Sequence, residues 1–262
     1  MAEFSFNELV REIAQNKKMS AEHRFSKQII DEKPRDVYLA TCEQIASYYE
    51  PFGFKYSKSG QYLRLKQKDS EFVFQISFSS SHYNVADVNV SVSVYASVIS
   101  QKFKKWQSEN IKGKFNSYPS EHICGGLIGN LQDKTVYMKW NVGNKATREQ
   151  EIENILENIN RLAIPYFDKF NNIQNLITEI EEKGNYYGFI GMYDLAEFIM
   201  YVSTKETLEK TLSNFLTQRK TWKKYHKALS DLKNGVELDG TYWSQIAKLT
   251  KDLDLKIIEI QK

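Results

Sequence analysis

The sequence predicts an α+β fold, in which an antiparallel meander sheet with flanking helices is followed by an all-helical C-terminal region. Between Asp87 and Val98 every even position is Val or Ala, whereas the odd positions are Asp, Asn, Ser or Tyr. A period of two is that of a strand with one buried face. Residues 72–78 alternate in the same way, and two such strands in tandem indicate an antiparallel sheet. Beyond Gly184 only helical spacings follow.

The segment before the sheet is expected to hold two helices. Residues 4–15 carry a short amphipathic pattern, and the polar stretch after them completes an N-terminal helical arm over residues 1–33. Pro34 then stands where a helix can begin, and apolar residues recur at helical spacing up to Glu50. A proline and a glycine shortly after that residue end the helix.

Four strands follow in chain order and form the predicted meander. Polar turns separate them, and the last is the long alternating strand of residues 88–98. The three earlier strands are predicted at residues 54–56, 62–66 and 71–78. A short helix or an extended arm over Lys102–Asn110 and an edge strand over Val136–Trp140 are expected after the meander.

A long helix is expected near the end of the sheet domain, which spans residues 34–183. Thr147 is the predicted N-cap, with Gln150 at the capping-box position, and an apolar stripe follows at helical spacing. Pro165 is expected to kink or end this helix. A further helix should end at Gly184, where the sheet domain stops.

The rest of the chain, residues 184–262, is predicted to form a helical C-terminal subdomain. It contains apolar residues at helical spacing and no period of two. Its helices are predicted at residues 195–202, 208–216, 222–232 and 243–260.

Composition limits the classes of function. The 262 residues carry a formal net charge of +3, which is only mildly basic for a nucleic-acid binder. The first ten residues include two glutamates and lack the apolar core of a signal peptide. No run reaches the roughly 18 apolar residues of a membrane-spanning helix. A reducing, cytoplasmic location without membrane contact is therefore the expectation.

Five short motifs occur in a defined order within residues 36–183: Phe52-Gly53-Phe54-Lys55, Tyr62-Leu63-Arg64, Phe74-Gln75-Ile76-Ser77, Lys139-Trp140 and Ala163-Ile164-Pro165-Tyr166-Phe167. In their order and spacing they resemble a bacterial family known only as domain of unknown function 4304. The resemblance implies an α+β domain and brings no established activity or functional residue with it. Members of such families often lie near toxin or phage-defence genes, which is an association and not a mechanism.

No catalytic, cofactor-binding or metal-binding residue is predicted. The four histidines have no partner at metal-ligand spacing, and Cys42 lies in an apolar helix that does not favour a nucleophile. Gly125, Gly126 and Gly129 lack the following Lys-Ser/Thr of a phosphate loop, so they are interpreted as turn glycines. The sequence therefore disfavours an enzyme. A catalytic site assembled from residues that are far apart in the sequence is the remaining alternative.

The polar positions of the alternating strands form the predicted protein-contact surface. If the apolar face packs against helices, these side chains meet solvent or a partner. The candidate contact residues are Gln75, Ser77, Asn89, Ser91, Ser93 and Tyr95.

Two segments that combine basic and aromatic residues provide an alternative. Cations neutralise phosphates and aromatic rings stack on bases, so residues 102–106 and 219–227 are candidate nucleic-acid contacts. An amphipathic helix with buried aromatics and solvated lysines also explains the second segment. The candidate residues are Lys102, Lys104, Lys105, Trp106, Arg219, Lys220, Lys223, Lys224 and Lys227.

The favoured function is a non-catalytic, cytoplasmic protein-interaction module, with an immunity or phage-defence accessory role as the specific hypothesis. A sheet face that carries Ser, Asn and Tyr, together with an aromatic-rich helical tail, is typical of interfaces. A protein partner is therefore expected, no cofactor is expected, and nucleic acid is the alternative partner. The sequence leaves the oligomeric state open.

Overall fold

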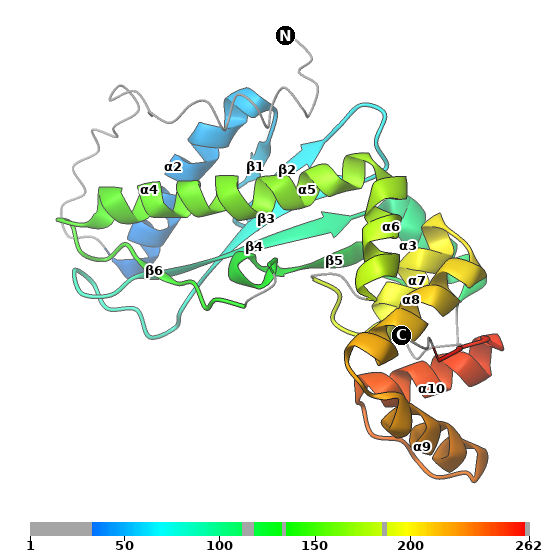
Figure 1. The fold of residues 1–262 in the computed structure, drawn as a ribbon. Coiled ribbons are helices and arrows are strands. Elements are labelled where there is room, and N and C mark those ends of the chain that lie inside the picture. Colours follow the sequence, from blue (N-terminus) through cyan, green and yellow to red (C-terminus); the bar gives the residue numbers. More distant parts are fainter. Residues whose placement is uncertain (1–32, 112–117, 133–134, 185–187, 260–262) are drawn as a thin grey trace. The chain divides into compact units, whose positions relative to one another are not determined.

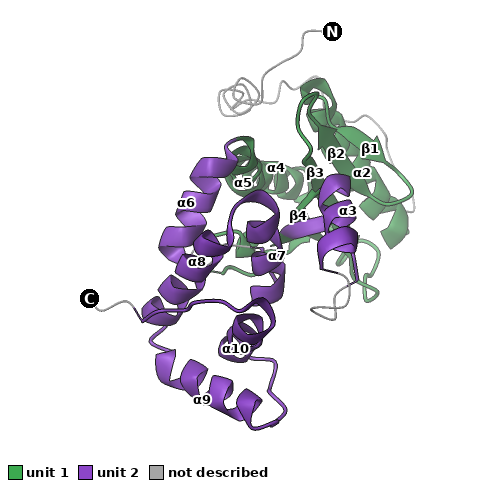
Figure 2. Cartoon of the chain, turned by 90° about the vertical axis from the view of Figure 1, so that its right-hand side faces the viewer, with its two compact units in different colours: residues 1–99, 125–171 green, residues 100–124, 172–262 purple. Residues whose placement is uncertain are grey.

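The computed structural model describes four stretches of the chain, residues 33–111, 118–132, 135–184 and 188–259 (Figure 1). Contacts divide the chain into two compact units, which consist of residues 1–99 with 125–171 and of residues 100–124 with 172–262 (Figure 2). The first unit holds most of the sheet and its helices, and the second is mainly helical. The predicted fold class, an antiparallel sheet with flanking helices followed by a helical C-terminal region, is confirmed.

The two units differ from the domains expected from the sequence. The helix α3 (Gln101–Asn110) belongs to the second unit because it packs on α7 (Met192–Val202). The helix α6 (Ile173–Lys183) belongs there too, because it packs on α8 (Lys205–Gln218). Of the expected N-terminal arm, residues 1–32 lie outside the described residues.

The strands form one sheet whose first four members follow the predicted meander. The order across the sheet is β1-β2-β3-β4-β5, and β6 also pairs with β4. The pairs β1·β2, β2·β3 and β3·β4 are all antiparallel, with Ser77 opposite Tyr95 in the longest ladder. The bounds are β1 (Lys55–Ser57), β2 (Tyr62–Lys66), β3 (Val73–Ser80), β4 (Ser91–Ile99), β5 (His122–Leu127) and β6 (Trp140–Asn141).

The helices of the first unit cover the apolar face of the sheet (Figure 1). The helix α2 (Pro34–Tyr49) packs on β1, and α4 (Arg148–Asn158) continues through a π-helical turn into α5 (Ile164–Asp168). Phe74 stacks on Phe167 of α5, with ring centroids 4.9 Å apart and planes 18° apart. The Tyr49 hydroxyl donates to Asn160 Oδ1 at 2.6 Å, which ties α2 to the π-helical turn.

The apolar face consists of every second residue of the strands, as the alternating pattern predicts. Across the register, Leu63 pairs with Ile76 and Ile76 with Ala96, so their side chains lie on one face, and all three are fully buried. Each buried aliphatic or aromatic side chain of this size stabilises the fold by about 1.5–3 kcal/mol relative to exposure. This side of the sheet therefore holds the core of the first unit.

The predicted start of the long strand was wrong. β4 begins at Ser91, and Val88 is 64% exposed instead of buried. The residues before β4 form the tip of the β3–β4 hairpin, where Val85 and Asn89 make an isolated bridge. Asn141 donates from Nδ2 to the Val88 carbonyl and accepts from the Val90 N–H at Oδ1, both at 2.9 Å. These side-chain hydrogen bonds replace the ladder that a longer strand would have formed.

Two further expectations near this edge hold only in part. The strand expected over Val136–Trp140 contains only Trp140 of β6, because the segment before it makes no ladder. Thr147 is the N-cap of α4, but its side chain makes no cap hydrogen bond and the capping box is absent. Its backbone (φ −111°, ψ −4°) lies outside the extended region from which an N-cap hydroxyl reaches the first turn.

The helix expected to kink or end at Pro165 continues past this residue with a local adjustment. Pro165 lies in the first turn of α5, where its missing N–H costs little. The π-helical turn at Ile159–Ala163 directly precedes it. Such a turn inserts one residue into a helix without breaking it, so α4 and α5 stay joined across the sheet.

The second unit contains the predicted C-terminal helices. The helices α9 (Trp222–Lys233) and α10 (Tyr242–Leu253) pack on each other, and α7 packs on α8 and on α10. The helix α6 ends at Gly184, as predicted, in a left-handed conformation (φ 66°). The helix α10 ends at Leu253, short of the expected residue 260, because Asp254 adopts a left-handed conformation (φ 51°).

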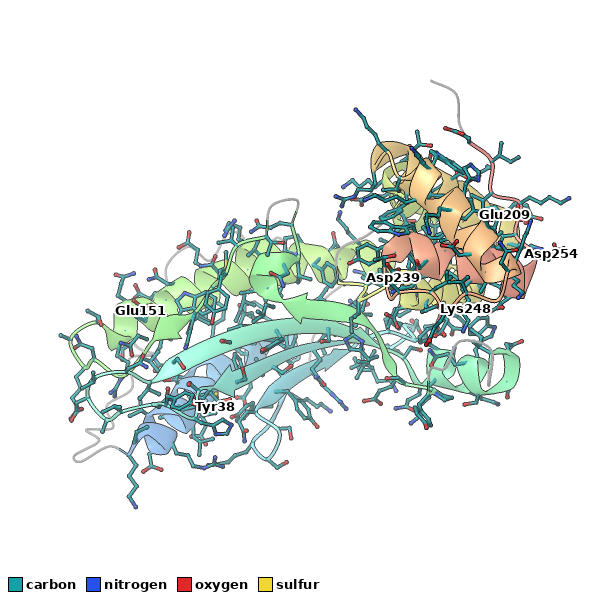
Figure 3. All side chains as sticks on the ribbon, turned by 90° about the horizontal axis from the view of Figure 1, so that it is seen from below. Tyr38, Glu151, Glu209, Asp239, Lys248 and Asp254 are labelled. Carbon is teal, nitrogen blue, oxygen red and sulfur yellow. The ribbon has the colours of Figure 1, made fainter. Side chains whose placement is uncertain are left out.

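The segment after α10 runs along α8. The Lys256 N–H donates to Glu209 Oε1 at 2.7 Å, and Lys205 Nζ donates to the Asp254 carbonyl at 2.6 Å. Figure 3 labels Glu209 and Asp254 close together at the end of the helical unit. Within the described residues, no helix combines the length and the apolar character needed to cross a membrane.

The stack of Phe74 on Phe167 predicts a large loss of stability when the ring is removed. Phe74 is fully buried, so Phe74→Ala should lower the free energy of unfolding by about 3–5 kcal/mol through lost burial and a cavity. Tyr83→Ala is the control, because Tyr83 is 87% exposed and the change should stay within about 0.5 kcal/mol. Urea denaturation measures both. Equal effects of the two substitutions would contradict this packing.

Candidate interaction surface

The described helices of the first unit, α2, α4 and α5, lie on one face of the sheet, and the candidate surface is the opposite face. We call it the open face. Its side chains alternate with the buried ones on β1, β2 and β3 and are exposed or half-exposed there, whereas Ser97 and Ile99 at the end of β4 are buried. It consists of Lys55, Ser57, Tyr62, Arg64, Lys66, Val73, Gln75, Ser77, Ser79, Ser93 and Tyr95.

The strand register arranges the open face into two neighbouring rows. One row runs from Lys55 through Arg64 to Gln75, which are paired across β1, β2 and β3. The next row places Ser77 between Tyr62 and Tyr95. Directly opposed side chains in an antiparallel sheet lie about 4.5–5.5 Å apart at Cβ, so each row is continuous. A basic row therefore lies beside an aromatic row.

A cation–π contact and hydrogen bonds connect side chains of the two rows. The Arg64 guanidinium lies over the Tyr62 ring, 4.6 Å from its centroid, and Arg64 Nε donates to Gln75 Oε1 at 2.7 Å. Gln75 Nε2 in turn donates to Ser77 Oγ at 3.5 Å. A cation over an aromatic ring contributes about 0.5–1 kcal/mol at an exposed site. These contacts limit the rotamers of Arg64 and Gln75 before any partner binds.

The charged side chains that the described strands place on the open face are all basic. Lys55, Arg64 and Lys66 lie on it, and none of the strands in the described part of the chain contains Asp or Glu. Clustered basic side chains produce a positive potential that attracts negative groups. The open face is therefore suited to a partner that carries carboxylates or phosphates.

The predicted contact residues divide between the open face and the hairpin. Gln75, Ser77, Ser93 and Tyr95 lie on the open face, and Tyr95 is the most exposed of these at 36%. Asn89, outside the strand, is half-exposed in the hairpin.

Ser91 is the predicted contact residue that the structure removes from the surface. It is only 2% exposed, because Asn84 Oδ1 accepts from its N–H at 3.0 Å and from its hydroxyl at 3.2 Å. Tyr62 and Arg64, which were not predicted, contribute more to the open face. Their alternation with the apolar residues Leu63 and Leu65 is the signal that could have identified them.

The basic residues of the nucleic-acid hypothesis lie on the surface of the second unit. Three of them are on α3, and the others lie around the start of α9. Lys105 pairs with Glu109 at 3.8 Å and Lys227 with Asp231 at 2.6 Å, which reduces the local positive charge. The exposed cations are Lys102, Lys104, Lys105, Arg219, Lys220, Lys223, Lys224 and Lys227.

The aromatic residues of the same segments face inward. Trp222 and Tyr225 are 7% and 2% exposed, and their polar atoms contact Thr217 and Thr250 within the unit. Trp106 is half-buried and lies parallel to the Phe103 ring. Stacking on bases needs an open ring face, so these rings do not supply it.

Cys42 lies in an environment that suppresses nucleophilic chemistry. It is fully buried in α2, and burial raises the pKa of its thiol to about 12. Burial also raises the pKa of the neighbouring Tyr38 hydroxyl, which hydrogen-bonds with this thiol. Only the thiolate is an effective nucleophile, so Cys42 is inert near neutral pH. Among the described residues, no group of three or more His, Cys, Asp and Glu is placed to hold a metal ion.

Comparison with protein-family models, with curated proteins and with solved structures found no match for this chain. The resemblance to the family of domain of unknown function 4304 stays a prediction. Function is therefore inferred from the surface itself.

The raised pKa values in α2 predict a loss of stability at alkaline pH. A thiol whose pKa is higher in the folded state stabilises the fold fully below its unfolded pKa of about 8.5. That contribution is lost as the pH rises toward the folded value of about 12. Urea denaturation between about pH 8 and pH 11 should show falling stability, with a shallower fall in Cys42→Ala. Identical pH profiles for the two proteins would contradict the assignment.

Proposed function

We propose that this protein is a non-catalytic interaction module that binds a protein partner through the open face. The observation that carries the proposal is the face of the sheet opposite the described helices of the first unit, which presents Tyr62, Arg64 and Tyr95 together. Tyr and Arg are enriched among the residues that dominate binding energy at protein interfaces. The mutual contacts of Arg64 and Gln75 lower the entropy lost when a partner orders these side chains.

The charge of the open face favours an acidic segment of the partner. Arg64 can receive a carboxylate on its guanidinium, whose planar fork suits two parallel hydrogen bonds. Lys55, which pairs with Arg64 across the ladder, and Lys66, two residues further along β2, are both exposed and extend the positive surface. Tyr95 adds apolar area and a hydroxyl to the neighbouring row. The proposed partner therefore combines carboxylates with apolar side chains.

Nucleic acid is a weaker candidate for the partner. Binding through the exposed lysines of α3 and α9 would be electrostatic and sensitive to salt, without the stacking that the sequence suggested. A cytoplasmic location and an immunity or phage-defence accessory role are part of the proposal only as hypotheses, and both rest on the sequence.

Substitutions on the open face should release the partner. The full chain is used to capture proteins from nuclease-treated lysate of its source cells, and the retained protein is then titrated. Arg64→Glu and Tyr95→Ala should each weaken its binding at least about tenfold, because each removes a side chain of the type that anchors interfaces. Lys233→Glu, an exposed change in α9, is the matched control and should bind like the wild type.

Two results would contradict the proposal. One is a partner that binds the two open-face variants and the control variant equally. The other is the absence of any protein partner combined with salt-sensitive binding to nucleic acid that is lost when Lys220, Lys223 and Lys224 are neutralised together.

A further inference from the structure

Residues 3–13 combine acidic and apolar side chains, which is the chemistry that the open face attracts. We call them the N-terminal segment. Its three glutamates, Glu3, Glu8 and Glu12, are accompanied by a single basic residue, Arg11. Five large apolar residues lie among them, at positions 4, 6, 9, 10 and 13. The segment precedes the described part of the chain, and its composition is what matches the open face.

The negative charge is confined to this segment and does not extend into the chain that follows. With three Glu and one Arg, the N-terminal segment has a formal charge of −2. Residues 14–33 contain five Lys or Arg and three Asp or Glu, which gives +2. The strands place Lys55, Arg64 and Lys66 on the open face, so the segment and this face carry opposite charges. Opposite charges on two surfaces attract each other and favour their association.

The chain is long enough to bring the N-terminal segment to the open face. Residues 14–32 connect it to Lys33, and a chain of that length spans up to about 60 Å when extended. The helix α2, which packs on β1, has 16 residues and is therefore about 24 Å long. Passing the helix layer adds about 10–12 Å, and crossing β1 and β2 adds about 10 Å. The connection thus exceeds the path from Lys33 around the β1 edge to Arg64.

A weak contact is sufficient, because the segment and the open face belong to one chain. A short linker holds two such parts at an effective concentration of about 1 mM. At that concentration a contact with a dissociation constant of about 0.1 mM is occupied in about nine-tenths of the molecules. The segment therefore needs only a small part of the contact area that a separate protein partner would bury.

We propose that the N-terminal segment occupies the open face of its own chain and that the protein partner displaces it. The glutamates lie against Lys55, Arg64 and Lys66, and the apolar side chains lie against the Tyr62 and Tyr95 rings. Displacement by a partner rests on the proposed function, whereas occupation of the open face does not. The affinity for the partner is then reduced by the fraction of molecules whose open face is free.

Photo-crosslinking within the purified full chain tests the occupation. A benzophenone amino acid is placed either at Ser77, in the middle of the open face, or at Glu153, exposed on α4 on the helix-covered side. Mass spectrometry should find crosslinks from Ser77 to residues 3–13 and none to them from Glu153. An equal mixture of unlabelled and heavy-isotope-labelled chains distinguishes the two origins of a crosslink, because a crosslink within one chain carries a single label.

Charge reversal assigns the contact to the glutamates. Glu8→Lys combined with Glu12→Lys should lower the yield of the Ser77 crosslink at least about threefold, because like charges then meet at the open face. Glu22→Lys combined with Asp31→Lys makes the same change of net charge outside the segment and should leave the yield unchanged. No crosslink from Ser77 to the segment, crosslinks that join only different chains, or an unchanged yield in the first double variant would overturn the proposal.

Partner binding tests the displacement separately. The double variant of Glu8 and Glu12 should bind the partner at least about threefold more tightly than the double variant of Glu22 and Asp31, because more of its molecules have a free open face. Equal affinities would overturn the displacement. A crosslink within the chain, together with a partner that is insensitive to Arg64→Glu, would confirm the occupation and contradict the proposed function. The two proposals therefore fail by different results.

Discussion

The one-sided burial of the sheet is the constraint on which the rest of the first unit depends. Leu63, Ile76 and Ala96 meet in register, and Phe74 receives the Phe167 ring from α5. A one-residue slip of any strand would turn its apolar side chains to solvent, so the hydrophobic effect fixes the register. The same register brings Lys55, Tyr62, Arg64 and Tyr95 into adjacent rows on the opposite side. The core and the open face are thus two consequences of one pattern.

The two units contribute different chemistry. In the first, Arg64, Tyr62 and Gln75 form an exposed surface that is already held by cation–π and hydrogen-bond contacts. In the second, Gln107 and Glu197 form a buried polar pair beside a small cavity. The exposed surface of the first unit suits a partner with a large contact area, because aromatic and arginine side chains dominate the binding energy of protein interfaces.

The sequence predicted what depends on local patterns. Alternation and helical spacing identified the meander, the helices and the side of the strands that carries Gln75, Ser77 and Tyr95. It failed at Val88, because the hairpin is closed by Asn141, which is 53 residues away from Val88 in the chain. The cavity was not predictable for the same reason: its wall joins three elements that are separate in sequence. The alternation of polar and apolar residues in β2 could have identified Tyr62 and Arg64.

The central claim is that the open face, and not the helix-covered side, contacts a protein. Site-specific photo-crosslinking in the source cells tests it most directly, with a benzophenone amino acid placed at Tyr95, at Ser77 or at Glu153. Glu153 is exposed on α4, on the helix-covered side of the sheet. The account predicts a discrete crosslinked protein from Tyr95 and Ser77 and none from Glu153. The same crosslinked protein from all three positions, or from Glu153 alone, would contradict it.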